Sequence, residues 1–244
     1  MKVLIISDIH GNYYALKAVV ENTRFDMIIC CGDLICGYPL PQECVDVIKI
    51  ICSYICMGNH DYAVAYNKKP FDNVPPQYIK YAKIFDWARD VARESLCEEA
   101  IEYLRVIPRE KKFLVDGTTF YLNHTVPNLS HNYHLDLECP QSEIENHYKD
   151  IHADILITGH THVPYIKKLK NRVLINPGSV GASWDGDPRA SFAVFDTRTG
   201  QIELCRFEYD ITKTSSLLKK LNFPKYLLFS LQTGLLPDDP DVAL

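Results

Sequence analysis

Short apolar runs that alternate with amphipathic segments most constrain the fold of this chain. The runs lie at 2–7, 26–31 and 52–57, and helices are expected between them at 12–22 and 41–51. Such alternation predicts a parallel sheet with helices packed on its faces. Ligands of such sheets bind at the carboxyl ends of the strands, so the residues after each run are the candidate functional residues.

Apolar runs of this kind are followed by polar motifs at five places. In chain order the motifs are Asp8-Ile9-His10, Gly32-Asp33, Gly58-Asn59-His60-Asp61, Asn123-His124 and Gly159-His160-Thr161-His162. Their carboxylate, amide and imidazole groups are those that a hydrolytic centre with two metal ions needs. The spacing of Asp8 and His10 puts both on one face of an extended strand, and the two oxygens of Asp33 can bridge two ions. A single Asp in such a place is usually a turn former or a helix cap, but the five motifs together predict a metal site.

The second half of the chain predicts a second sheet. Its expected elements are a hairpin at 113–123, a helix at 141–151, and strands at 154–158, 165–169, 173–176, 190–195 and 202–207. Two sheets packed face to face beneath outer helices make an α/β sandwich. The 244 residues are expected to form a single domain, 1–244, with a helical insertion at about 62–108 and a C-terminal helical tail at about 210–244.

In their order, residue types and spacing, the five motifs resemble the calcineurin-like metallophosphoesterase family over residues 1–208. The segments 176–181 and 187–191 add a resemblance to its small bacterial and archaeal phosphoesterases. The family implies two mixed β-sheets packed as a sandwich with flanking helices. It also implies hydrolysis of a phosphomonoester or phosphodiester by a hydroxide that bridges two divalent ions.

The resemblance also implies which residues bind the two ions. One metal takes Asp8, His10, Asp33 and His162, and the other takes Asp33, Asn59, His124 and His160. All seven positions carry the residue type that the family pattern requires. Mn²⁺ is the expected metal, with Fe, Zn or Ni as alternatives, because nitrogen and oxygen ligands alone do not select one ion.

Three further residues are candidates for the reaction itself. The resemblance places His60 beside the metals, where it contacts the phosphate or protonates the leaving oxygen, a task that suits a group titrating near neutrality. Ser/Thr protein phosphatases with these motifs carry an orienting Asp and a phosphate-binding Arg after the second motif, and residues 34–38 contain neither. Asp61 is therefore expected either to orient His60 or to support a metal ligand. Arg189 is expected to contact phosphate, or equally to hold its own loop through an ion pair.

The insertion is rich in large aromatic residues and has two open interpretations. A helix expected at 77–104 would carry Tyr81, Ile84 and Trp87 about one turn apart. The insertion either caps the site and affects substrate choice, or packs on the sheet edge or in the subunit interface of a homo-oligomer. Two histidines that follow the fourth motif, His131 and His134, are expected to face solvent rather than substrate.

The composition excludes several classes of protein. A net charge of −5 and a pI near 6.0 indicate no basic face for long nucleic acid, so a small substrate such as a nucleotide or phosphodiester is expected. No apolar run approaches the ~20 residues of a membrane span, and Asp8 and His10 interrupt the apolar start in a way that a signal peptide does not. The nine cysteines lack paired Cys-x-x-Cys spacing and are expected to be reduced core thiols of a cytoplasmic protein.

Two other functions compete with the phosphoesterase. One is a metal-bearing interaction scaffold of the same fold with weak catalysis, and the other is a Ser/Thr protein phosphatase. The presence of His60 beside a full ligand set favours the enzyme over the scaffold, and the missing Asp and Arg disfavour the protein phosphatase. The motifs build the phosphate end of the site, so the variable loops and the insertion are expected to select the rest of the substrate.

Overall fold

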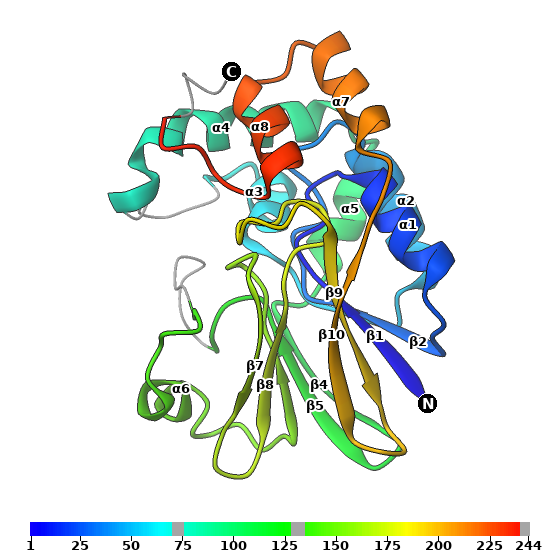
Figure 1. Cartoon of the computed structure of the whole chain (residues 1–244), viewed down its shortest axis with the longest axis vertical. Helices are drawn as coiled ribbons and strands as arrows, with labels where there is room; N and C mark the ends of the chain where they lie inside the picture. The colour runs from blue at the N-terminus through cyan, green and yellow to red at the C-terminus, as the bar shows by residue number, and fades with distance from the viewer. Residues whose placement is uncertain (70–75, 128–134, 240–244) are drawn as a thin grey trace.

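Two five-stranded β-sheets lie face to face in the computed structural model, which describes residues 1–69, 76–127 and 135–239 (Figure 1). The first sheet contains, in spatial order, β10 (Gln201–Phe207), β9 (Ala190–Asp196), β1 (Lys2–Ile6), β2 (Met27–Cys30) and β3 (Tyr54–Ile55). The second contains β4 (Glu110–Val115), β5 (Thr118–Asn123), β6 (Ile155–Ile157), β8 (Val173–Pro177) and β7 (Pro164–Lys168). Both sheets are mixed. In the first, β1, β2 and β3 pair in parallel and β9 and β10 pair antiparallel on one side; in the second, the parallel strands β5, β6 and β8 lie between antiparallel edge strands. The predicted sandwich is confirmed.

One part of the predicted topology is wrong. The strands expected at 190–195 and 202–207 were assigned to the second sheet, but β9 and β10 belong to the first. β9 pairs antiparallel with β1, where Val3 lies opposite Phe195. The physical reason is that β1 is buried on both faces and would otherwise leave an unpaired edge beside the core.

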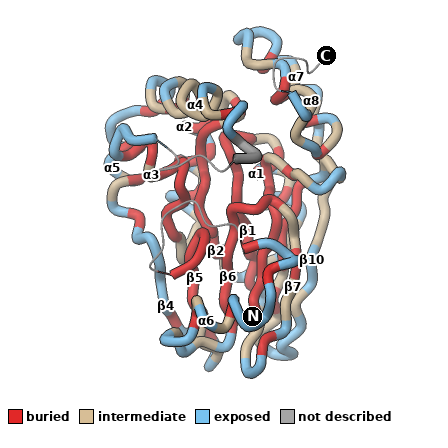
Figure 2. The backbone as a smooth tube through the Cα atoms, turned by 90° about the vertical axis from the view of Figure 1, so that its left-hand side faces the viewer, coloured by how far each residue is buried: buried red, intermediate tan, exposed pale blue. Residues whose placement is uncertain are grey.

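Successive side chains of each strand point to opposite faces of the sheet, and this divides the core into layers. Leu4 and Ile6 of β1 pack against helices, whereas Val3 and Ile5 pack against the second sheet. The helices on that outer face are α1 (Tyr13–Asn22), α2 (Pro41–Ile51) and α5 (Glu98–Val106). On the far face of the second sheet, α6 (Gln141–His147) buries Ile144. Buried residues accordingly run along the strands of both sheets (Figure 2).

A second group of helices lies beyond the ends of the sheets, at the top of Figure 1. It comprises α3 (Asn59–Tyr66), a 3₁₀ turn η1 (Pro76–Tyr81), α4 (Ala82–Glu94), α7 (Ile211–Lys220) and α8 (Lys225–Thr233). The insertion and the tail pack on each other here, since Trp87 of α4 meets Phe223 with ring centroids 5.0 Å apart. Among the described residues, no helix has the length and apolar character needed to cross a membrane.

The stretch expected to be helical at 77–104 forms two helices, α4 and α5, after the 3₁₀ turn η1. α4 ends at Ser95, whose hydroxyl donates to the carbonyl of Val91 at 2.7 Å, and α5 begins after an extended Cys97. The break lets Ile101 and Leu104 enter the core under the first sheet while α4 runs over the sheet ends. A periodic pattern across two helices of similar polarity does not reveal such a change of direction.

Candidate metal centre

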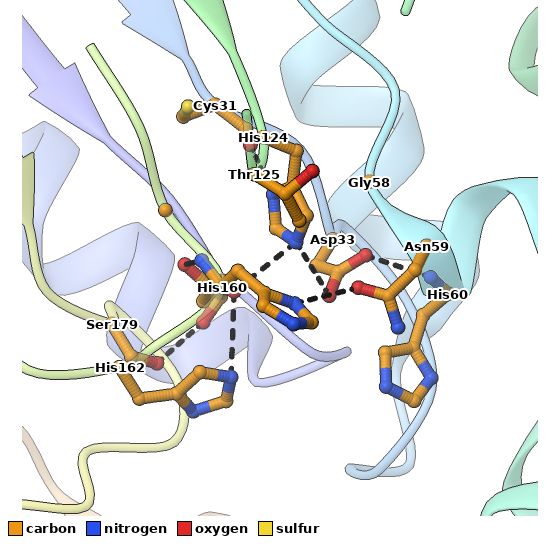
Figure 3. Close-up of polar contacts among 12 residues, drawn as sticks. Cys31, Asp33, Gly58, Asn59, His60, His124, Thr125, His160, His162 and Ser179 are labelled. Carbon is orange, nitrogen blue, oxygen red and sulfur yellow. Dashed lines mark hydrogen bonds and ion pairs between the residues drawn. The ribbon is translucent and has the colours of Figure 1, made fainter. Parts of the chain in front are cut away.

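The seven predicted metal ligands converge at the carboxyl ends of the parallel strands. Figure 3 shows five of them, namely Asp33, Asn59, His124, His160 and His162. They are contributed by the segments after β1 (Asp8 and His10), β2 (Asp33), β3 (Asn59), β5 (His124) and β6 (His160 and His162). All seven are buried. Because the segments come from both sheets, the site lies where the two sheets meet and depends on their packing.

The ligand atoms form two main groups. Asp8, His10 and His162 make one group, and Asp33, His124 and His160 make the other, with the donor atoms of each group within 4.8 Å of one another. Asn59 joins the second group, since its Oδ1 lies 2.9 Å from Nδ1 of His160. The division matches the two ligand sets that the family resemblance implies.

Asp33 lies between the two groups. Its Oδ2 is 3.2 Å from Nε2 of His124 in the second group and 3.8 Å from Nε2 of His10 in the first. Asp8 reaches its own group, with Oδ1 3.4 Å from Nε2 of His162. A carboxylate placed between two sets of donors can serve both, which is the geometry expected of a bridging ligand.

Backbone carbonyls orient three of the imidazoles. Nδ1 of His10 lies 2.7 Å from the carbonyl of Cys36, and Nδ1 of His124 lies 2.6 Å from that of Cys31. His162 makes the same kind of bond to Ala182. A carbonyl only accepts, so Nδ1 carries the proton and Nε2 keeps its lone pair toward the carboxylates.

The donor set fits divalent cations. Within the described part of the chain, Oδ2 of Asp33 and Nε2 of His124 are buried without a hydrogen-bond partner. Leaving such atoms unsatisfied is costly, and a cation between them would satisfy both. The neighbouring groups also keep the carboxylates ionised: burial raises the pKa of Asp33, but the imidazoles of His124 and His60 outweigh it, and the pKa falls well below the usual value.

His60 lies next to this centre and, with His10 and Asp33, makes a third group whose donor atoms lie within 4.8 Å of one another. Its backbone N–H donates to Oδ1 of Asp33 at 2.9 Å, and its ring centroid is 5.1 Å from that of His10. Burial lowers the pKa of His60 to about 4, and the nearby imidazoles add to this against the attraction of Asp33. At neutral pH the ring is therefore neutral and presents one N–H donor.

Asp61 contacts the backbone that carries a ligand. Its carboxylate accepts from the N–H groups of Asp33 (2.8 Å), Leu34 (2.9 Å) and Gly58 (3.1 Å). Burial, with the nearby charge of Asp33, raises the pKa of Asp61 to about 7. Of the two roles expected for Asp61, these contacts correspond to support of a metal ligand.

Arg189 lies outside the pocket over the metal ligands. Its Nη2 is 2.6 Å from Oδ2 of Asp187, and nearly half of its side-chain surface is exposed. This geometry corresponds to the alternative in which an ion pair holds the loop, and not to a phosphate contact. His131 and His134 lie outside the described residues.

A pocket opens from the ligands toward the second group of helices. The empty space along it, counted together with the part that is open solvent, is about 670 Å³. Its inner end includes His10, Asp33 and His60, while its outer walls include Trp184 and residues of α4 and α8. No pattern in the sequence predicted that the C-terminal tail would line this pocket. Trp184 could have been suspected, because it follows the family-like segment 176–181.

The chain is similar to known proteins of one family. The sequence pattern of the calcineurin-like phosphoesterase superfamily domain matches residues 1–200. The uncharacterized protein MJ0912 of Methanocaldococcus jannaschii is 29% identical over 92% of this chain and 95% of its own length. Phosphodiesterase MJ0936 of the same organism is 22% identical over 81% of this chain and 93% of its own length. A crystal structure of a metallophosphoesterase from Sphaerobacter thermophilus aligns at a TM-score of 0.79 and 27% identity, covering 96% of this chain and 99% of that one.

Proposed function

The chain belongs to the calcineurin-like phosphoesterase superfamily, and on that premise we propose that it hydrolyses a phosphomonoester or phosphodiester at a centre of two divalent metal ions. The observation that carries the proposal is that Asp33, a member of the second group of donors, also lies 3.8 Å from Nε2 of His10 in the first. A centre for one ion would need only one of these groups. The buried, ionised carboxylates and the oriented imidazoles support the same conclusion.

We assign the ligands as two overlapping sets. Asp8, His10, Asp33 and His162 would hold one ion, and Asp33, Asn59, His124 and His160 would hold the other. When bound, the ions would supply an activated water and neutralise charge on the phosphate. Mn²⁺ is the expected ion, and Fe, Zn or Ni would fit the same nitrogen and oxygen donors.

We assign to His60 a contact with the substrate, and to Asp61 a structural role in the site. His60 lines the pocket beside Asp33, and its neutral ring can donate a hydrogen bond to the phosphate or to the leaving oxygen. Asp61 is a positioning residue, because it ties the backbone of Gly58 to that of Asp33 and so fixes the bridging carboxylate.

The proposal is tested by turnover in the metal-loaded protein. Chelator-treated protein is reloaded with Mn²⁺, Fe²⁺, Zn²⁺ or Ni²⁺ and assayed with bis(4-nitrophenyl) phosphate and 4-nitrophenyl phosphate. Asp33→Asn is expected to nearly abolish hydrolysis and to reduce bound metal, because it removes the negative charge between two cations. The control is Asp150→Asn, at an exposed position, which should change neither.

Two results would overturn the assignment. Full activity of Asp33→Asn with two metals bound would remove Asp33 from its bridging role. Wild-type protein that binds two metals but hydrolyses neither ester, nor any of a panel of phosphoesters, would instead be a metal-bearing scaffold.

A further inference from the structure

The pocket over the metal ligands has apolar outer walls built by three distant parts of the chain. Phe85 and Ala88 come from α4, Leu227 comes from α8, Leu236 follows α8, and Trp184 comes from the loop after β8. These residues are not part of the five motifs, so the walls are a property of this chain beyond its metal ligands.

Two aromatic rings bring this apolar surface directly to the metal ligands. Trp184 stacks on His162, with ring centroids 3.7 Å apart and an interplanar angle of 16°. On the opposite side Phe85 meets the ring of His60 at 6.0 Å, edge to face. An organic group attached to a phosphate bound at the metals would therefore lie in apolar surroundings immediately beside the charged centre.

Among the described residues, the outer pocket offers no cationic partner for additional negative charge. None of the described residues that line it is Lys or Arg. Its outer polar groups include the hydroxyls of Tyr38, Tyr226 and Ser230, and burial raises the pKa of both tyrosines, so these groups are neutral. The second or third phosphate of a nucleoside polyphosphate would lose water here without gaining a cationic partner, which is costly.

The tail that closes the pocket is fixed on both sides of Leu236. Before it, the carbonyl of Gly234 accepts from the N–H of Gly186 at 2.8 Å. After it, the carbonyl of Pro237 accepts from the hydroxyl of Tyr81. The outer wall is thus formed before any ligand binds, which favours affinity for a group that fits it.

From these observations we infer the class of substrate, an inference that rests on the phosphoesterase function proposed above. The substrate is an ester with a single phosphate and an apolar or aromatic organic group. The phosphate binds at the metal ligands, and the organic group packs between α4, Trp184 and the segment around Leu236. Nucleoside polyphosphates and esters with anionic groups are poor ligands of the same site.

The inference is tested by calorimetric binding to the Mn²⁺-loaded protein, a measurement that does not require turnover. The probes are the monomethyl esters of methyl-, benzyl- and 2-carboxyethylphosphonic acid, which have the same phosphonate charge and differ in the attached group. The benzyl compound should bind at least ~10-fold tighter than the methyl compound, because its ring is removed from water. The carboxyethyl compound should bind no tighter than the methyl compound.

Two neighbouring leucines provide a matched pair of variants. Leu236 lines the pocket, whereas Leu235 is 44% exposed and does not line it. Leu236→Ala should lower the preference for benzyl over methyl by ~3-fold or more and leave the affinity for the methyl compound unchanged. Leu235→Ala should leave both affinities unchanged.

The possible outcomes separate this inference from the proposed function. Equal affinity for the benzyl and methyl compounds, or tightest binding of the carboxyethyl compound, would overturn the inference and leave the hydrolytic function untouched. Benzyl preference in a protein that hydrolyses no ester would support the pocket and count against the function. An equal loss of preference in Leu235→Ala and Leu236→Ala would show that the wall around Leu236 is not the binding surface.

Discussion

A single methyl group added at Gly58 is expected to disable the metal centre. The backbone there has φ of −85° and ψ of 174°, which any L-residue adopts, so Gly58→Ala introduces no backbone strain. Its Cβ, however, would lie 2.0 Å from Oδ1 and 2.4 Å from the backbone nitrogen of Asp33. Cβ atoms essentially never approach another atom within 3.0 Å, so the carboxylate has to move by about 1 Å or more.

The size of the effect follows from that displacement. Misplacing a reacting group by about 1 Å costs on the order of 10²-fold in rate, and we expect a loss of at least that size in kcat/KM. Overpacking also destabilises a core by ~1–3 kcal/mol. For a chain of this size this corresponds to a decrease in Tm of roughly 2–12 °C.

The measurements are kcat/KM for bis(4-nitrophenyl) phosphate, bound metal by mass spectrometry, and Tm in the presence of a chelator. Gly200→Ala is the matched control, because Gly200 has a φ of +71° and nothing within 4 Å of an added Cβ. That variant should lose ~1–2 kcal/mol of stability through backbone strain and keep full activity. Gly58→Ala with wild-type kcat/KM and metal content would refute the reasoning.

Three other predictions follow from the site. His60→Ala should retain both metals and lose ~10²–10⁴-fold in turnover, with a smaller defect for esters of good leaving groups; loss of the metals would make His60 a ligand. Tyr81→Phe, which removes the hydroxyl that holds Pro237, should raise KM for bulky aromatic esters and spare small ones; an unchanged KM would show that the anchor is dispensable. Mn²⁺ at 100 times its Kd should add ~2.7 kcal/mol of stability in thermal unfolding, and this gain should vanish near pH 5 as the imidazoles protonate.

The positions of the metal ligands could be predicted from the sequence because each motif directly follows a short apolar run. Once a run is identified as a strand, the next residues must lie at its carboxyl end, and the parallel arrangement brings these ends together. The partner of a strand could not be predicted in the same way. The mostly apolar run of β9 is typical of a strand with two buried faces, but it is equally compatible with pairing to β1 or to a strand of the second sheet.

The walls of the pocket could not be predicted because they depend on contacts between distant residues. Tyr81 and Pro237 are 156 positions apart, and only the folded chain brings α4 and the tail together. The amphipathic pattern of α4 shows that one face is buried but not what covers it. The role of Arg189 could not be predicted because two partners were open to it, and the structure pairs it with Asp187, two residues away.

The ligand pairs converge for a local reason other than extended geometry. Extended backbone would put Asp8 and His10 on one face, but β1 ends at Ile6 and both residues have left-handed φ values, 53° and 52°. His160 and His162 repeat the arrangement at 70° and 60°, and Asp33 has 53°.

Outside glycine this conformation costs ~1–2 kcal/mol per residue, so the five positions together are strained. Backbone hydrogen bonds stabilise these strained conformations. The N–H of Asp8 donates to the carbonyl of Gly32 at 3.0 Å, and the N–H of His10 donates to the carbonyl of Asp33 at 3.0 Å. Each of these bonds ties the first motif to the second, so the strained turns are stable only when both strands are paired. The sandwich thus acts as the support that keeps two carboxylates and four imidazoles in an arrangement that the isolated segments would not adopt.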